Sequence, residues 1–198
     1  MGSSFRRNRI INGNMAVAQR GTASQTITAA AALAYTMDRW YAWCTGANVT
    51  GIRISSTGTL ASPAQYAYQF TGAASVTAIN FAQRIEAVNS YDLAGTTATL
   101  SVVMANSLLT AVTWTAYYAT TTNDTFGTIA SPTVTTIASG SFAVTAAPTL
   151  FTAQIPIPSE ATTGIQIVFS VGAQTSGTWT ITNVQLEAGT TNTPYERI

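Results

Sequence analysis

Alternation of apolar and polar side chains with a period of two residues dominates this 198-residue chain. In the segment 65–70, for example, Tyr66, Tyr68 and Phe70 fall on one face and smaller or polar residues on the other, which is the pattern of a half-buried strand. No window of about 11 residues combines a helical period of 3.6 with charged residues on the opposite face. The sequence therefore predicts an all-β protein.

Ten segments carry the strand pattern, and turn signals rich in Gly, Asn and Ser separate them. They are Trp40–Cys44, Val49–Ile54, Gln65–Phe70, Phe81–Glu86, Ala98–Met104, Val112–Ala119, Phe142–Thr145, Leu150–Ile157, Ile165–Val171 and Trp179–Leu186. The chain length suits one domain, and strands in this number and at this spacing favour a two-sheet β-sandwich of jelly-roll type. We expect residues 1–9 to form a short, extended, basic arm and residues 10–198 a single jelly-roll domain.

The strand expected at Trp40–Cys44 has bulky side chains on both faces, since Trp40 alternates with Tyr41 and Trp43. Tryptophan in a sandwich strand usually belongs to the core, so we expect Trp40, Trp114 and Trp179 to be buried. Aromatic rings also stack on sugars. We therefore take Tyr41, Trp43 and Tyr117 as candidates for contact with a glycan or a neighbouring chain.

Missing residue types exclude most catalytic chemistry. The chain has no His and no Lys, and Cys44 is its one cysteine, which rules out His-dependent triads, His-bearing zinc sites, Walker A loops and Schiff-base lysines. Seven carboxylates are present, and no sequence signal pairs any of them: Asp38, Glu86, Asp92, Asp124, Glu160, Glu187 and Glu196. We predict a protein that is not an enzyme, and we assign no cofactor and no metal.

Positive charge gathers at the N-terminus. Residues 1–21 carry four arginines and no acid, whereas the rest of the chain carries four arginines and seven acids. We expect Arg6, Arg7 and Arg9 to bind another protein through bidentate guanidinium contacts, because four arginines without a basic stripe are too few for a nucleic-acid site. No apolar run reaches membrane-spanning length. Uncharged, Thr-rich strand edges favour a homo-oligomer, with a trimer as the expected form.

Five motifs follow one another along residues 8–198. They are Asn8–Asn14 running to Gln19–Gly21, Tyr35–Trp40, Phe81–Glu86, Leu93–Thr96 leading into Thr99–Ser101, and Asn183–Gly189 closing with Thr193–Arg197. Together they resemble a module of tailed-bacteriophage virion proteins, mostly tail fibres, with a jelly-roll fold like that of carbohydrate-binding and galactose-binding-like domains. Physically these motifs indicate scaffold: Asn12-Gly13 is a turn pair, and Gln185 and Glu187 have the spacing to hydrogen-bond to each other.

The resemblance implies a structural protein on the surface of a phage particle, where its partners are capsid or tail subunits. Only residues 1–7 precede the motifs, which favours a capsid decoration or cement protein over a fibre with its own shaft. The alternative is a receptor-binding tail-fibre or head-fibre component that recognises host surface carbohydrate. No sugar-binding residue is carried over, because sugar binding in related folds depends on loops outside these motifs.

Overall fold

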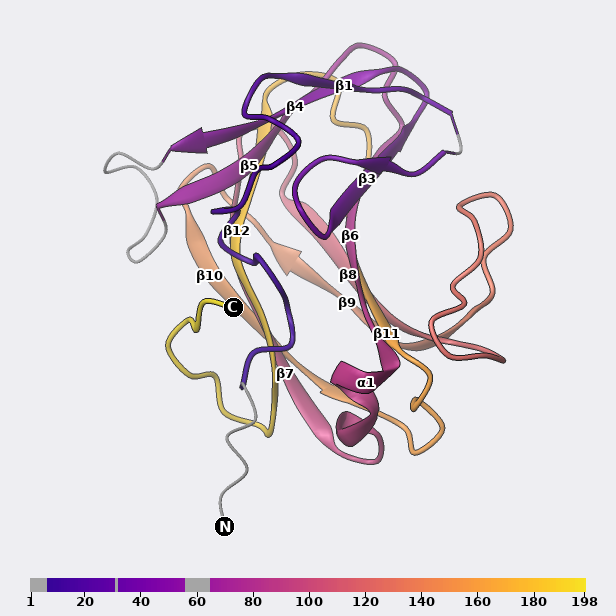
Figure 1. Ribbon diagram of the computed structural model, residues 1–198. Coiled ribbons are helices and arrows are strands. Elements are labelled where there is room, and N and C mark those ends of the chain that lie inside the picture. Colours follow the sequence, from indigo (N-terminus) through magenta and orange to yellow (C-terminus); the bar gives the residue numbers. More distant parts are fainter. Residues whose placement is uncertain (1–6, 31, 56–64) are drawn as a thin grey trace.

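The computed structural model describes residues 7–30, 32–55 and 65–198, and within them the chain forms twelve strands and one short helical segment (Figure 1). The strands are β1 (Gln25–Ile27), β2 (Ala34–Tyr35), β3 (Trp40–Thr45), β4 (Val49–Ser55), β5 (Tyr66–Thr71), β6 (Ala78–Ile85), β7 (Thr97–Asn106), β8 (Ala111–Ala119), β9 (Val134–Ala143), β10 (Thr149–Pro156), β11 (Ile165–Val171) and β12 (Thr178–Ala188). The helical segment is α1 (Ala87–Ser90), which continues into the 3-10 turn η1 (Tyr91–Leu93). No helix in these ranges is long and apolar enough to cross a membrane.

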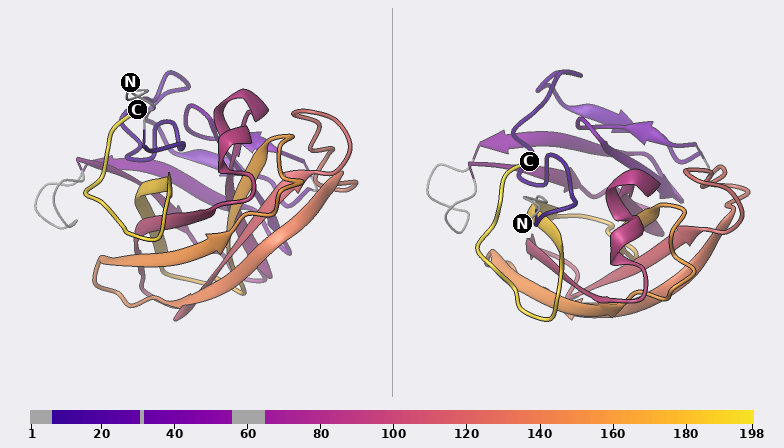
Figure 2. Two further views of the ribbon diagram at one scale, coloured as in Figure 1. Left: turned by 90° about the horizontal axis from the view of Figure 1, so that it is seen from below. Right: turned by 60° about the horizontal axis from the view of Figure 1, so that its bottom comes forward.

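The strands form two antiparallel six-stranded sheets that face each other across one core (Figure 2). The first sheet has the order β1-β4-β5-β12-β7-β10, and the second has the order β2-β3-β6-β11-β8-β9. Chain neighbours such as β11 and β12 lie in different sheets, which is the alternation of a jelly roll. The predicted fold class is confirmed.

All ten predicted strands exist, with ends that differ by a few residues except at β9. Strand β9 begins eight residues before Phe142. This start was not predicted, because residues 134–141 are mostly Thr, Ser, Ala and Gly, and their two large apolar residues, Val134 and Ile137, do not alternate with a period of two. The short edge strands β1 and β2 were not predicted. A helical turn also stands at Ala87–Leu93, where the sequence indicated only a turn.

Stacked aromatic rings connect the two sheets. Trp40 of β3 and Tyr68 of β5 each stack on Phe81 of β6, at centroid distances of 4.6 and 5.4 Å, and Phe70 stacks on Trp179 at 5.2 Å. All five side chains are fully buried, and Trp114 of β8 is also buried. The predicted core positions of Trp40, Trp114 and Trp179 are confirmed.

The first and the last of the five motifs meet along β12. Residues 8–14 run beside this strand: Arg9 N donates to the Leu186 carbonyl at 2.8 Å, and Val184 N donates to the Gly13 carbonyl at 3.0 Å. The β12 register shifts between Thr182 and Gln185, so the strand bulges where the N-terminal segment lies against it. These motifs therefore act as scaffold, as their residue types indicated.

Side-chain amides complete this junction. The Gln83 side chain accepts from Ile11 N and donates to the Ile11 carbonyl, both at 2.8 Å. Gln185 Nε2 donates to Glu187 Oε1 at 3.0 Å, which confirms the expected bond within the closing strand. Glu187 is buried and also accepts from the amide and the hydroxyl of Thr193, so its carboxylate holds the C-terminal segment in place.

The basic residues at positions 7 and 9 contact the domain itself. Arg9 Nη2 lies 2.6 Å from a carboxylate oxygen of Asp92, and Arg7 Nε lies 3.6 Å from one of Glu196. Arg6 lies outside the described residues. The structure thus gives Arg7 and Arg9 intramolecular partners, and contact of Arg6, Arg7 and Arg9 with another protein stays a prediction.

Candidate functional site

The outer face of the second sheet carries an apolar cluster separate from the core. Tyr41, Ala82 and Val168 are its buried centre, and the partly buried Trp43 and Tyr117 pack against them. Because side chains alternate along a strand, Trp40 and Cys44 of β3 enter the core while Tyr41 and Trp43 lie on this outer face. The bulky residues on both faces of β3 thus serve two different clusters.

Strand register places the residues of this face in three rows, each crossing β6, β11 and β8. The rows are Trp43–Asn80–Ser170–Thr113, Tyr41–Ala82–Val168–Thr115 and Arg84–Gln166–Tyr117. The first and third rows carry hydrogen-bonding side chains between or beside aromatic ones. The middle row is mainly apolar.

A groove of about 390 Å³ lies over these rows, and we call it the outer groove. Its wall is the connection between β8 and β9, residues 120–133, which contributes Phe126, Ile129 and Pro132. This connection is held by a bridge between Gly127 and Pro132 and by the hydrogen bond from Thr133 N to the Phe126 carbonyl. The lining is aromatic and uncharged polar, and Arg84 is its one charged residue among those described.

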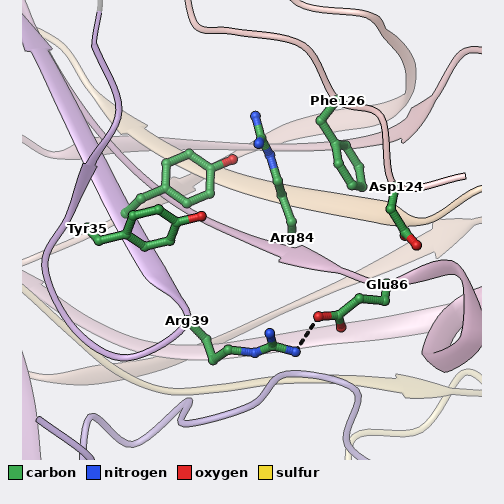
Figure 3. A pocket seen from close by; sticks show the side chains of 7 residues that line it. Tyr35, Arg39, Arg84, Glu86, Asp124 and Phe126 are labelled. Atoms are coloured by element: carbon green, nitrogen blue, oxygen red, sulfur yellow. Dashed lines mark hydrogen bonds and ion pairs between the residues drawn. The ribbon is translucent and has the colours of Figure 1, made fainter. Parts of the chain in front are cut away.

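A smaller cavity of about 220 Å³ lies next to the groove, and we call it the side cavity (Figure 3). It is lined by Tyr35, Arg39, Tyr41, Arg84, Glu86, Asp124 and Phe126, so that Arg84 and Phe126 belong to both spaces. Arg39 pairs with Glu86 here. The neighbouring Asp38 takes no part in this ion pair, and its carboxylate accepts from Gln19 N at 2.7 Å.

Arg84 separates the two spaces and is fixed from several sides. Its Nε donates to Gln166 Oε1 and its Nη2 to the Gly127 carbonyl, each at 3.2 Å. Its guanidinium carbon also lies 5.2 Å from the centre of the Tyr41 ring and 5.1 Å from that of Phe126. These contacts hold Arg84 in one position and join the 120–133 connection to the sheet.

The side cavity brings together two of the seven carboxylates, Glu86 and Asp124, which the sequence did not pair. Burial opposes ionisation of Glu86, but backbone hydrogen bonding and the Arg39 guanidinium outweigh it and hold the pKa of Glu86 below its ordinary value. Asp124 Oδ1 accepts from Ala87 N at 2.7 Å, at the start of α1. A glycosidase acid needs a raised pKa, so Glu86 does not have the properties of a proton donor.

The three aromatic candidates, Tyr41, Trp43 and Tyr117, lie on one face but differ in solvent exposure. Trp43 and Tyr117 are partly exposed and line the outer groove. Tyr41 is only 1% exposed, because Trp43 stacks on it and Arg84 and Tyr35 pack around it. Its ring therefore supports the groove from below and is not a free stacking surface.

The polar residues of the groove were not singled out from the sequence. Asn80 and Arg84 lie on β6 and Gln166 lies on β11, and only the register between these two strands places Gln166 beside Arg84. The alternation of side chains would have been enough to assign Arg84 and Gln166 to the outer face, but not to place them next to each other. Among the described residues, no group of three or more Cys, Asp or Glu side chains is placed to hold a metal ion.

Burial of the Tyr41 hydroxyl makes stability depend on pH in the alkaline range. Burial raises the pKa of Tyr41 to about 12, against a smaller lowering by Arg84. Between pH 10 and 12 the unfolded chain therefore loses a proton that the folded chain keeps, so the free energy of unfolding falls as pH rises through this window. Tyr41→Phe should remove on the order of 2 kcal/mol of this fall in chemical denaturation series at pH 9 to 12. Tyr91→Phe, at an exposed position, is the matched control and should follow the wild-type curve. If the free energy of unfolding of the Tyr41→Phe protein fell with pH as steeply as that of the wild type, the prediction would be wrong.

No family model and no curated protein sequence matches this chain. Solved structures do match its fold. A domain of bacteriophage CBA120 tailspike protein 4, described as the enzymatically active domain, superposes with a TM-score of 0.56 at 16% identity, over 91% of this chain and 21% of that one. The chain thus spans about a fifth of that solved tailspike chain.

The structure of TmCBM61 in complex with β-1,4-galactotriose matches with a TM-score of 0.57 at 13% identity, over 93% of this chain and all of the other. An arabinose-bound α-L-arabinofuranosidase, MgGH51, matches with a TM-score of 0.50 at 12% identity, over 94% of this chain and 31% of that one. These likenesses are confined to the fold. The chain is a jelly-roll β-sandwich of the kind found in carbohydrate-binding modules and in a phage tailspike.

Proposed function

We propose that this protein binds a carbohydrate chain in the outer groove, without catalysis, as a receptor-binding component of a phage particle. The observation that carries the proposal is the placement of Trp43 and Tyr117 at opposite corners of a face that also carries uncharged hydrogen-bonding side chains, with Arg84 as its one charged residue among those described. Sugars present both an apolar ring face and a set of hydroxyls, and such a surface meets both.

The dimensions of the face favour a chain over a single sugar. Trp43 on β3 and Tyr117 on β8 are separated by β6 and β11, which is about 14 Å across the sheet at the usual strand spacing. A ligand that contacts both rings must extend over several sugar residues. Asn80 and Ser170 lie between them, and no described residue hydrogen-bonds to the side chain of either, so both are available to a ligand.

The sequence left two roles open, capsid decoration and receptor binding, and we propose receptor binding. The tailspike and carbohydrate-binding folds support this role, and a place on the virion surface goes with it. The preference for capsid decoration rested on a short basic arm that docks on another protein, whereas Arg7 and Arg9 pair with Glu196 and Asp92 of the same chain. Oligomerisation stays a prediction.

The test is Trp43→Ala in binding to arrayed bacterial surface polysaccharides and plant galactans, followed by calorimetry on the best ligand. Loss of the stacking surface should weaken binding about tenfold to a hundredfold. Tyr91→Ala removes an exposed aromatic residue outside both spaces and should bind as the wild type does. Absence of binding to every glycan, or equal binding by the Trp43 variant, would count against the proposal.

A further inference from the structure

The Tyr41 hydroxyl is a buried polar group without a partner. Its residue is 1% exposed, and no described residue hydrogen-bonds to the phenol oxygen. Arg84 lies near enough to favour ionisation of this hydroxyl but does not meet the geometry of a hydrogen bond to it. Buried hydroxyls in proteins are nearly always paired, so an unpaired one at the wall of a cavity indicates a group made to pair with something else.

The side cavity offers both kinds of hydrogen-bonding group around this hydroxyl. Figure 3 shows Tyr35, Arg84, Phe126 and the Arg39–Glu86 pair arranged around one space, with Asp124 beside Phe126. Tyr35 is 48% exposed, so its ring lies at the edge of the cavity. The guanidinium groups donate, the carboxylates accept, and a tyrosine hydroxyl does either.

The charges of the side cavity balance. Two arginines face two carboxylates, and Glu86 is held ionised by Arg39. A ligand with its own negative charge would meet Glu86 and Asp124 as well as the arginines. A neutral ligand with several hydroxyls, each of which both donates and accepts, fits such a lining without leaving a charge unpaired.

We propose that the side cavity is a subsite for one neutral sugar residue that branches from, or terminates, the chain bound in the outer groove. This inference rests on the proposed function, because the two spaces share Arg84 and Phe126 and a branched glycan would occupy both. The cavity has about half the volume of the groove, which suits a single residue and not a chain. The Tyr41 hydroxyl supplies the hydrogen bond by which the side cavity selects this sugar residue over others.

The experiment titrates the protein with D-galactose, D-glucose, D-mannose, L-rhamnose and N-acetyl-D-glucosamine, and follows backbone amide shifts by NMR. At least one sugar should shift the amides of Tyr35, Glu86 and Asp124. Tyr41→Phe should weaken that sugar about three- to tenfold without lowering stability at pH 7, because the hydroxyl has no partner to lose. Tyr91→Phe is the matched control and should bind as the wild type does.

The outcomes separate this inference from the groove assignment. If no sugar shifts these amides, if Tyr41→Phe binds equally well, or if D-glucuronate binds more tightly than the neutral sugars, the subsite is wrong. Trp43→Ala should keep single-sugar binding while weakening polysaccharide binding about tenfold to a hundredfold. Single-sugar binding together with unchanged polysaccharide binding by the Trp43 variant would contradict the groove and uphold the cavity.

Discussion

Replacing Trp40 with alanine is expected to destabilise the domain by about 3–5 kcal/mol. The indole is fully buried, stacks on Phe81 at 4.6 Å and donates from Nε1 to the Asn12 carbonyl at 3.1 Å. Truncation would therefore open a cavity between the sheets and also leave the Asn12 carbonyl without this donor. Urea denaturation followed by circular dichroism measures the change.

Trp43→Ala is the control for this prediction, since Trp43 lies three residues away on the opposite face of β3. Its side chain is partly exposed, so its removal should cost clearly less stability than removal of Trp40. Equal losses for the two variants would mean that the division of β3 into a core face and an outer face is wrong.

Replacing Gly13 with alanine is expected to cost about 3–4 kcal/mol. An added Cβ would lie 2.0 Å from the Val184 carbonyl oxygen, which is backbone of β12 and cannot rotate away. Relief of this overlap requires the N-terminal segment to move off the strand, with loss of the hydrogen bond from Val184 N to the Gly13 carbonyl. The melting temperature should fall, and exchange of the Val184 and Leu186 amides should become faster.

Gly172→Ala provides the matched control for Gly13→Ala. A Cβ at Gly172 would meet nothing within 4 Å, and no left-handed backbone opposes the substitution there. This variant should be neutral or slightly more stable, because alanine restricts the unfolded chain. If Gly13→Ala behaved like Gly172→Ala, the close approach of residues 8–14 to β12 would be refuted.

The strands and the core were predictable because a strand that is buried on one face has apolar residues at every second position, and this pattern is visible in a short stretch of sequence. Tyr68, Phe70 and Trp179 alternate with smaller residues, and each lies in the core as that alternation indicates. Strand β9 was largely missed for the same reason. Its first part is rich in Thr and Ser, and its residues are all partly buried or exposed. Because neither face of this part is fully buried, no apolar periodicity marks it.

The candidate site was predictable only in part, because it depends on pairings between distant residues. The sequence placed Tyr41, Trp43 and Tyr117 as candidates, and the register brings them to one face. It could not show that Tyr41 is covered, since the groups that cover it include Arg84, which is 43 residues away in the chain. Nor could charge distribution alone reveal that Arg9 pairs with Asp92.

The two chain ends described in the structure lie side by side next to β12 of the first sheet (Figure 1), whereas the outer groove lies on the outer face of the second sheet. Asn12 N donates to the Ile198 carbonyl at 3.2 Å, and Asn8 Nδ2 donates to the Glu196 carbonyl at 2.9 Å. A pulling force applied between the two ends would break these few bonds one after another. A force between one end and a ligand in the groove would instead cross both sheets and act on the packed aromatic core, so the domain should resist tension far better when one end alone is under load.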